Sequence, residues 1–248
     1  MRFKTKGLIL REQNIGERDK LVWILTGSHG VIRAFARGAK SIKSPKCAGT
    51  GLLSYSSLSV FEGRDSCSID EAVAEEQFIG LRRDPVNMSM AQYFCELCLS
   101  LCPSGQEAEE HLRLVLNSLY MLANNKRPPL QIKVCFEMRL ISITGYMPDL
   151  VMCADCGAYE SPEMVFVPQT GRLYCSSCAD RHGVQGVRLP IAAVTALRHT
   201  VYADFDKLFS FSLREELLEP LSFASERYVA CMTQRDYPTL QFYKSMTI

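Results

Sequence analysis

Several motifs that mark common enzyme classes are absent from this 248-residue sequence. There is no G-x-x-x-x-G-K-[ST] segment, which argues against a P-loop nucleotide site, and no H-E-x-x-H segment, which argues against a helical zinc-protease site. A G-x-S-x-G nucleophile elbow is also missing, and the four histidines are scattered with no spacing that indicates a catalytic dyad. We therefore expect a protein that is not an enzyme.

Long apolar segments are absent as well. No stretch approaches the roughly 18 uninterrupted apolar residues of a membrane helix. The first apolar run, residues 8–10, is too short for the apolar core of a signal peptide. With 47% hydrophobic and 22% charged residues, the composition is typical of a soluble globular protein, and we expect a cytoplasmic location.

Acidic residues are missing between Lys20 and Phe61, although the net charge of the whole chain is only +1. Residues 1–61 contain eleven Lys and Arg against three acids, a charge of +8, whereas residues 62–248 carry −7. Such a basic segment on an acidic remainder indicates a polyanion partner at one end of the chain. The candidate DNA contacts are five cations within fourteen residues: Arg33, Arg37, Lys40, Lys43 and Lys46.

Glycine, serine and proline between residues 38 and 45 predict a loop for most of these cations. Long basic side chains on a loop can reach phosphates. A solvated basic loop without a ligand explains the loop alone equally well. Phe35 and Tyr55 would offer stacking surfaces for unpaired bases, but we favour a core position for Phe35 because it lies in the middle of a predicted strand.

Four of the eleven cysteines form two C-x-x-C pairs with eighteen residues between them: Cys153, Cys156, Cys175 and Cys178. Thiolate sulfur suits a tetrahedral zinc ion, and this spacing is typical of one structural Zn²⁺ held by four cysteines. Gly157, directly after the first pair, supplies the positive φ that the turn requires. We favour this interpretation over unrelated buried thiols, over His182 as a replacement ligand, and over a catalytic zinc ion, since four thiolates leave no open coordination position.

A second group of cysteines has a spacing similar to half of an iron–sulfur pattern: Cys95, Cys98 and Cys102. On a helix these positions share one face with Leu97 and Leu101. We therefore predict that they are small buried hydrophobic residues. Disulfides are not expected, because the cysteine count is odd and the predicted compartment is reducing.

Short apolar or alternating runs separated by turn residues predict five strands, at residues 6–11, 20–26, 30–37, 58–61 and 68–73. Five short strands fit a small closed barrel, of which the OB-fold is the commonest type. Helical spacing follows at residues 88–101, 107–124, 130–144, 190–202 and 213–233. The predicted fold is α+β, with an OB-fold barrel (1–77), a helical domain in two parts (78–149 and 184–248) and an inserted four-cysteine zinc module (150–183).

The chain resembles the RecO family of bacterial DNA repair and recombination mediators through most of its length. The most specific stretches are residues 136–140 and 145–148, which lead directly into the first cysteine pair. Residues 169–172 depart from the family, which commonly carries a glycine pair there. Further matching segments are residues 7–11, 16–20, 25–30, 37–44, 227–228 and 244–245.

This resemblance implies binding of single- and double-stranded DNA and annealing of complementary strands. It further implies partnership with RecR and with single-stranded-DNA-binding protein, through the tail of the latter, to help load the RecA recombinase. Some family members lack the cysteines, which indicates a structural role for zinc. A zinc-containing protein-interaction scaffold with no direct DNA role stays open as the alternative.

Overall fold

The computed structural model describes residues 1–64 and 66–247. The chain divides into two compact units, one formed by Met1–Asn124 with Tyr237–Ile248 and the other by Asn125–Asp236. This division joins the barrel to some of the helices, whereas the sequence predicts a separate barrel domain. The four predicted domain segments therefore stay a prediction. Among the described residues, no helix is long and apolar enough to cross a membrane.

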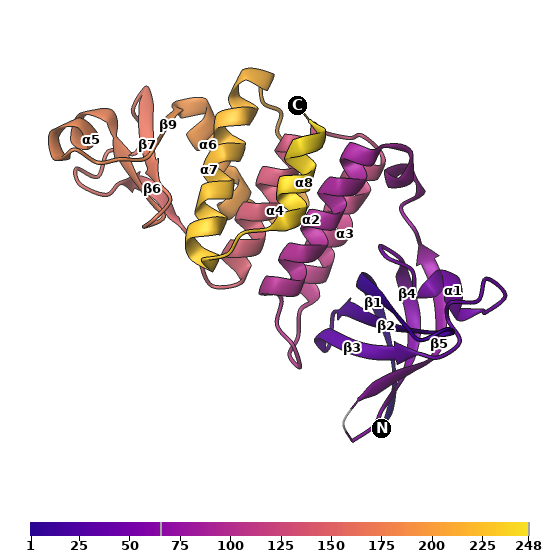
Figure 1. The fold of residues 1–248 in the computed structure, drawn as a ribbon. Helices are drawn as coiled ribbons and strands as arrows, with labels where there is room; N and C mark the ends of the chain where they lie inside the picture. Colours follow the sequence, from indigo (N-terminus) through magenta and orange to yellow (C-terminus); the bar gives the residue numbers. More distant parts are fainter. Residues whose placement is uncertain (65, 248) are drawn as a thin grey trace. The chain divides into compact units, whose positions relative to one another are not determined.

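Five strands of the first unit close into a barrel (Figure 1). The neighbour order is β1-β2-β3-β5-β4, and β4 pairs back with β1. This is the five-stranded OB-fold that the sequence predicts. The strands are β1 (Arg2–Ile15), β2 (Asp19–Thr26), β3 (Gly30–Ala36), β4 (Tyr55–Glu62) and β5 (Cys67–Glu76).

Strand β1 is long enough to serve two partners. Residues 2–8 pair with β4 and residues 7–15 pair with β2, and the register shifts between Ile9 and Arg11. A bulge of this kind bends a strand and increases its twist, which a closed barrel needs. Alternate side chains point inward to form the barrel core, which includes Ile9, Val22, Ile24, Ala34, Ala36, Leu58, Val60 and Ile69.

The loop before the third helix lies against the edge of β3. The amide of Val31 donates to the carbonyl of Pro103 at 2.8 Å, and Gly105 donates to His29 at 2.9 Å. Gly30 has φ +61°, and a Cβ there would lie 2.1 Å from the Pro103 oxygen, so this approach requires glycine.

Helices complete the first unit. Helix α2 packs against α3 and α8, and α2 and α3 also pack against β1 (Figure 1). Asp84 caps α2, since its carboxylate accepts from the amide of Val86 at 2.9 Å. Helix α8 was not among the predicted helices. The elements are α1 (Lys46–Gly49), the 3₁₀ helix η1 (Ile79–Arg83), α2 (Pro85–Leu101), α3 (Glu109–Ala123) and α8 (Pro238–Met246).

The second unit combines three long helices with a small sheet of order β6-β8-β7-β9. Helix α4 packs against α6 and α7. A hairpin precedes the second cysteine pair, formed by β7 and β8, which pair antiparallel. The elements are α4 (Pro129–Ile143), β6 (Asp149–Cys153), β7 (Glu163–Val167), β8 (Arg172–Cys175), α5 (Ser176–His182), β9 (Val187–Pro190), α6 (Ile191–Tyr202), η2 (Phe205–Lys207) and α7 (Glu215–Thr233).

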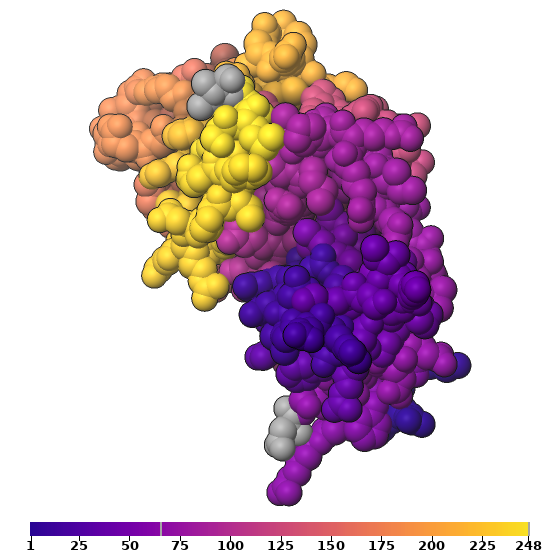
Figure 2. All heavy atoms as spheres, turned by 45° about the vertical axis from the view of Figure 1, so that its right-hand side comes forward, coloured from indigo at the N-terminus to yellow at the C-terminus, as the bar shows by residue number. Residues whose placement is uncertain are grey.

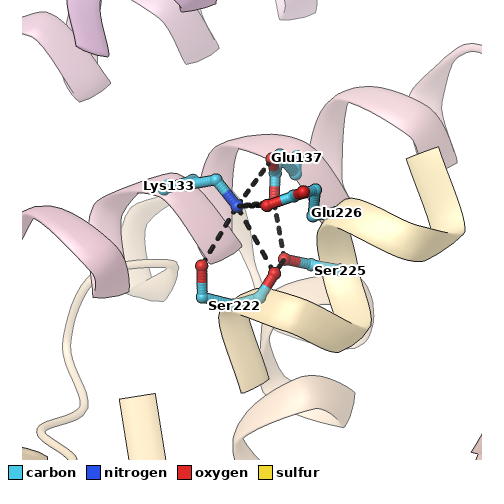
Figure 3. Close-up of polar contacts among 5 residues, drawn as sticks. All are labelled: Lys133, Glu137, Ser222, Ser225 and Glu226. Atoms are coloured by element: carbon cyan, nitrogen blue, oxygen red, sulfur yellow. Dashed lines mark hydrogen bonds and ion pairs between the residues drawn. The ribbon is translucent and has the colours of Figure 1, made fainter. Parts of the chain in front are cut away.

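A buried polar cluster joins α4 to α7 (Figure 3). Lys133 on α4 donates to Ser222 Oγ at 3.0 Å and lies 3.6 Å from Glu226 Oε2, both on α7. Ser225 donates to Glu137 Oε2 at 2.5 Å. These contacts satisfy charged groups that would be costly to bury alone, and they tie the two helices together.

Candidate functional site

The four cysteines of the two C-x-x-C pairs meet at one point. Their sulfur atoms all lie within 4.8 Å of one another, and the Cys156 and Cys175 sulfurs are 3.7 Å apart. A zinc ion with Zn–S bonds of about 2.3 Å would hold tetrahedral sulfurs roughly 3.8 Å apart. The group therefore fits a metal ion. Among residues 1–64 and 66–247 it is the one group of cysteine, histidine or acidic side chains found with a metal-binding arrangement.

The local backbone structure directs the four sulfur atoms toward one another. Cys153 ends β6, and a tight turn follows in which Gly157, at φ +72°, donates its amide to the Cys153 carbonyl at 3.0 Å. Cys175 ends β8, and Cys178 lies in the first turn of α5. Three of the four cysteines are buried and Cys156 is exposed.

The surroundings of the sulfurs also favour a cation. Burial opposes ionisation of the Cys153 thiol, but backbone amides, led by that of Cys156, outweigh it and lower its pKa to about 6. The pKa of Cys178 is raised, first by its hydrogen bond to the Asp155 carboxylate and then by the neighbouring thiols. His182 lies outside the sulfur group and contacts Asp155 at 3.2 Å.

The segment that carries the first cysteine pair is attached to α6 by a buried arginine, Arg198, that sequence reasoning missed. Arg198 donates to the carbonyls of Leu150 at 2.7 Å, Val151 at 3.0 Å and Tyr159 at 2.6 Å. Its guanidinium also lies 4.2 Å from the centre of the Tyr159 ring. One side chain thus holds the strand that leads to the first cysteine pair and the segment that follows this pair.

Two of the three cysteines of the second group are buried, as predicted. Cys95 and Cys98 are buried in α2, and Cys102 is half-buried at its end. Burial raises the pKa of Cys95 to about 12, and it also raises that of Cys98. Neutral thiols in an apolar helix face are packing residues and not metal ligands.

The five candidate cations differ in their surroundings. Arg33, Arg37 and Lys43 are exposed. Lys40 is half-buried and donates to the Gly16 carbonyl at 3.0 Å, while Lys46 donates to the Ile69 carbonyl at 3.3 Å. The loop is thus partly anchored to the barrel, and its Arg37 and Lys43 extend into solvent, as does Arg33 on β3.

Phe35 does not lie in the barrel core, so that expectation is wrong. Its neighbours Ala34 and Ala36 point inward, and strand alternation places Phe35 on the outer face, where it is half-buried. Ile32, Ala34 and Ala36 face the barrel core, and Phe35 alternates outward between the two alanines. A position in the middle of a strand does not reveal which face of the strand the side chain occupies.

Two family models match the chain. Residues 1–78 match the model described as Recombination protein O N terminal, and residues 82–241 match Recombination protein O C terminal. The chain belongs to the RecO family.

Curated RecO relatives match over nearly the full chain. The DNA repair protein RecO of Acetivibrio thermocellus is 34% identical over 243 residues, which is 98% of this chain and 96% of the relative. That of Symbiobacterium thermophilum is 30% identical over 97% of this chain and 96% of the relative. That of Heliobacterium modesticaldum is 30% identical over 94% and 85%. The chain is therefore a RecO family DNA repair protein.

The RecO barrel carries one further feature that sequence reasoning missed. Trp23 on β2 lies between Arg11 on β1 and Arg33 on β3, its cross-strand partners on either side. The guanidinium carbons lie 4.9 Å and 5.5 Å from the ring centre. The signal was that the chain contains a single tryptophan, although the register that joins it to Arg11 and Arg33 is visible only in the structure.

Proposed function

We propose that this chain is a non-enzymatic recombination mediator that binds single- and double-stranded DNA through its barrel and anneals complementary strands. The observation that carries the proposal is the charge of the barrel segment, +8 over residues 1–61 with no acid from Lys20 to Phe61, in a member of the RecO family. In the space-filling view, the indigo and violet spheres of the N-terminal strands gather on one part of the surface (Figure 2).

The proposed contacts are to phosphates. Arg33, Arg37 and Lys43 are exposed and would reach the DNA backbone directly, while Lys40 and Lys46 would contribute charge from positions beside the barrel wall. Neutralising phosphates lowers the repulsion between two strands. Annealing therefore needs no nucleotide hydrolysis, which agrees with the absence of a P-loop motif.

We further propose that the four cysteines hold one structural Zn²⁺. Soft thiolate ligands select zinc over the hard divalent cations, and a shell of four sulfurs is closed to substrate. The ion would fix β6, β8 and α5 to one another. We place this module at residues 150–183, between the helical parts 78–149 and 184–248, with the DNA-binding barrel at 1–77.

The family resemblance supports three partners: RecR, the tail of single-stranded-DNA-binding protein and, indirectly, the RecA recombinase. We propose that the chain acts with RecR to load RecA onto DNA coated by single-stranded-DNA-binding protein. The location would be the cytoplasm, at the nucleoid when DNA is bound.

The deciding experiment is annealing of complementary oligonucleotides coated with single-stranded-DNA-binding protein, with and without this chain. We expect faster annealing, together with direct oligonucleotide binding whose affinity falls steeply with salt, by a slope of roughly −0.7 per phosphate contact on single strands. Failure to bind any oligonucleotide at low salt would overturn the proposal and leave a protein-interaction scaffold as the better interpretation.

A further inference from the structure

A row of three side chains crosses the outer face of the barrel. Arg11, Trp23 and Arg33 are cross-strand neighbours on β1, β2 and β3. Trp23 points outward because Val22 and Ile24, on either side of it, are completely buried in the barrel core. Both arginines are exposed, and within residues 1–64 and 66–247 neither forms an ion pair. Their charges are therefore available to a ligand.

A pocket of about 410 Å³ adjoins this row. Its wall contains Trp23, Arg33 and Val31, and a second flat pair, Phe3 and His29, whose ring centres are 4.4 Å apart at an interplanar angle of 30°. The volume lies in the range of roughly 300–1,000 Å³ that is usual for small-ligand pockets. The pocket is therefore large enough for one flat ring system.

One acidic residue, Glu62, lines the same pocket. The backbone carbonyl of Glu62 accepts a hydrogen bond from the Met1 amino group at 2.6 Å. Glu12, next to Arg11, is paired with Lys20 at 2.6 Å. The surroundings of the row thus favour an anionic ligand.

We infer that this row and its pocket form a binding site for unpaired bases of single-stranded DNA. A base would stack on Trp23 and on the planar guanidinium groups, and Arg11 and Arg33 would also contact the flanking phosphates. The pocket would receive the base or its neighbour beside Phe3 and His29. This inference rests on the proposed DNA-binding function and assigns the residues that would distinguish single strands from duplexes.

Stacking on a protein ring distinguishes single strands from duplexes. Both faces of a base in a duplex are covered by its neighbours, so only an unpaired base can lie on Trp23. The exposed cations of the loop, in contrast, contact phosphates of either form. The two sets of residues therefore have different roles. The loop cations supply affinity for any DNA, and the row supplies preference for single strands.

The single tryptophan of the chain makes this site directly observable. Tryptophan fluorescence of the full chain, excited selectively over tyrosine, is followed during titration with an oligothymidylate, and anisotropy of the labelled oligonucleotide is measured in parallel. We expect quenching that saturates with the same midpoint as the anisotropy, and less quenching by a duplex of equal length. Binding seen by anisotropy without a change in tryptophan emission would overturn the inference and leave the proposed function intact.

Substitution of Trp23 provides the second test of this site. Trp23→Ala should weaken oligothymidylate binding roughly 5- to 150-fold, the factor that corresponds to about 1–3 kcal/mol per stacked base, and should weaken duplex binding much less. Trp23→Phe keeps an aromatic ring and is less prone to misfold than Trp23→Ala. Its affinity for oligothymidylate should lie between those of the unaltered chain and Trp23→Ala. Tyr120→Ala removes an exposed aromatic ring elsewhere and should have no effect. Equal losses for single strands and duplexes in both Trp23 variants would refute the site, whereas absence of binding by the unaltered chain would refute the proposed function itself.

Discussion

The ammonium group of Lys133 lies 3.0 Å from Oε1 of Glu137, one helical turn further along α4, and both side chains are almost completely buried. Ser222 and Glu226 of α7 complete the surroundings of the ammonium group (Figure 3). Desolvation makes such a pair a poor source of net stability, but removal of one partner leaves an uncompensated buried charge. The cluster therefore fixes how α4 and α7 pack.

We predict that Lys133→Met lowers the free energy of unfolding by about 3–5 kcal/mol, because the Glu137 charge would lose its partner. Joint substitution of Lys133 and Glu137 by methionine should recover part of that loss. Lys207→Met, which breaks an exposed pair with Asp204, is the control and should change stability little. Urea denaturation of the three variants measures this, and equal stability of Lys133→Met and Lys207→Met would contradict it.

Removal of metal should unfold the module around the four cysteines. We expect one zinc ion per chain in freshly purified protein, and a lower thermal midpoint both after chelation and in Cys153→Ser. The loss should be smaller than the roughly 10–16 kcal/mol of isolated zinc-finger peptides, because α6 supports the module through Arg198. Cys231→Ser, outside the sulfur group, should keep its metal. Metal analysis that finds no zinc would disprove the assignment.

The exposed loop cations should control the salt dependence of DNA binding. Arg37→Ala and Lys43→Ala should each reduce the slope for single strands by about 0.7, provided that each residue makes one phosphate contact. Lys126→Ala, an exposed cation of the second unit, should leave the slope unchanged. Lys46→Ala should mainly lower stability, since its ammonium group bonds to the Ile69 carbonyl. Titrations at several salt concentrations distinguish these outcomes, and an unchanged slope in Arg37→Ala/Lys43→Ala would remove the loop from the site.

His111 should contribute to acid sensitivity. Burial lowers its pKa below the ordinary 6.5, with a smaller opposing effect of Glu110, and within the described part of the chain neither ring nitrogen has a hydrogen-bond partner. The unfolded chain thus binds a proton at a higher pH than the folded chain. Stability is then lost as the pH falls below about 6.5, by at most roughly 1.4 kcal/mol per pH unit for one proton.

His111→Leu should remove this contribution, so that stability declines less between pH 7 and 5 than in the unaltered chain. Urea midpoints measured across this pH range provide the test. Parallel curves for the two proteins would show that another group causes the acid sensitivity.

Local features of the sequence predicted much of the fold. Alternation and turn residues predicted the five barrel strands, and helical spacing predicted five of the long helices close to their observed bounds. Helix α8 was missed because it is short and separated by the whole second unit from the helix on which it packs, α2. Phe35 was assigned to the core because it lies in the middle of a predicted strand, but a position along a strand does not reveal which face the side chain occupies.

The cysteine pairs were determined by the sequence itself, since a two-residue spacer forms a tight turn that directs both sulfurs to one point whatever surrounds it. Tertiary structure alone decided that Arg11, Trp23 and Arg33 form a row, because cross-strand register joins residues ten or more positions apart. It also decided that Lys46 faces the barrel while Lys43 faces solvent. A site whose residues lie within one turn is visible in the sequence. A site assembled from residues on different strands depends on packing and register.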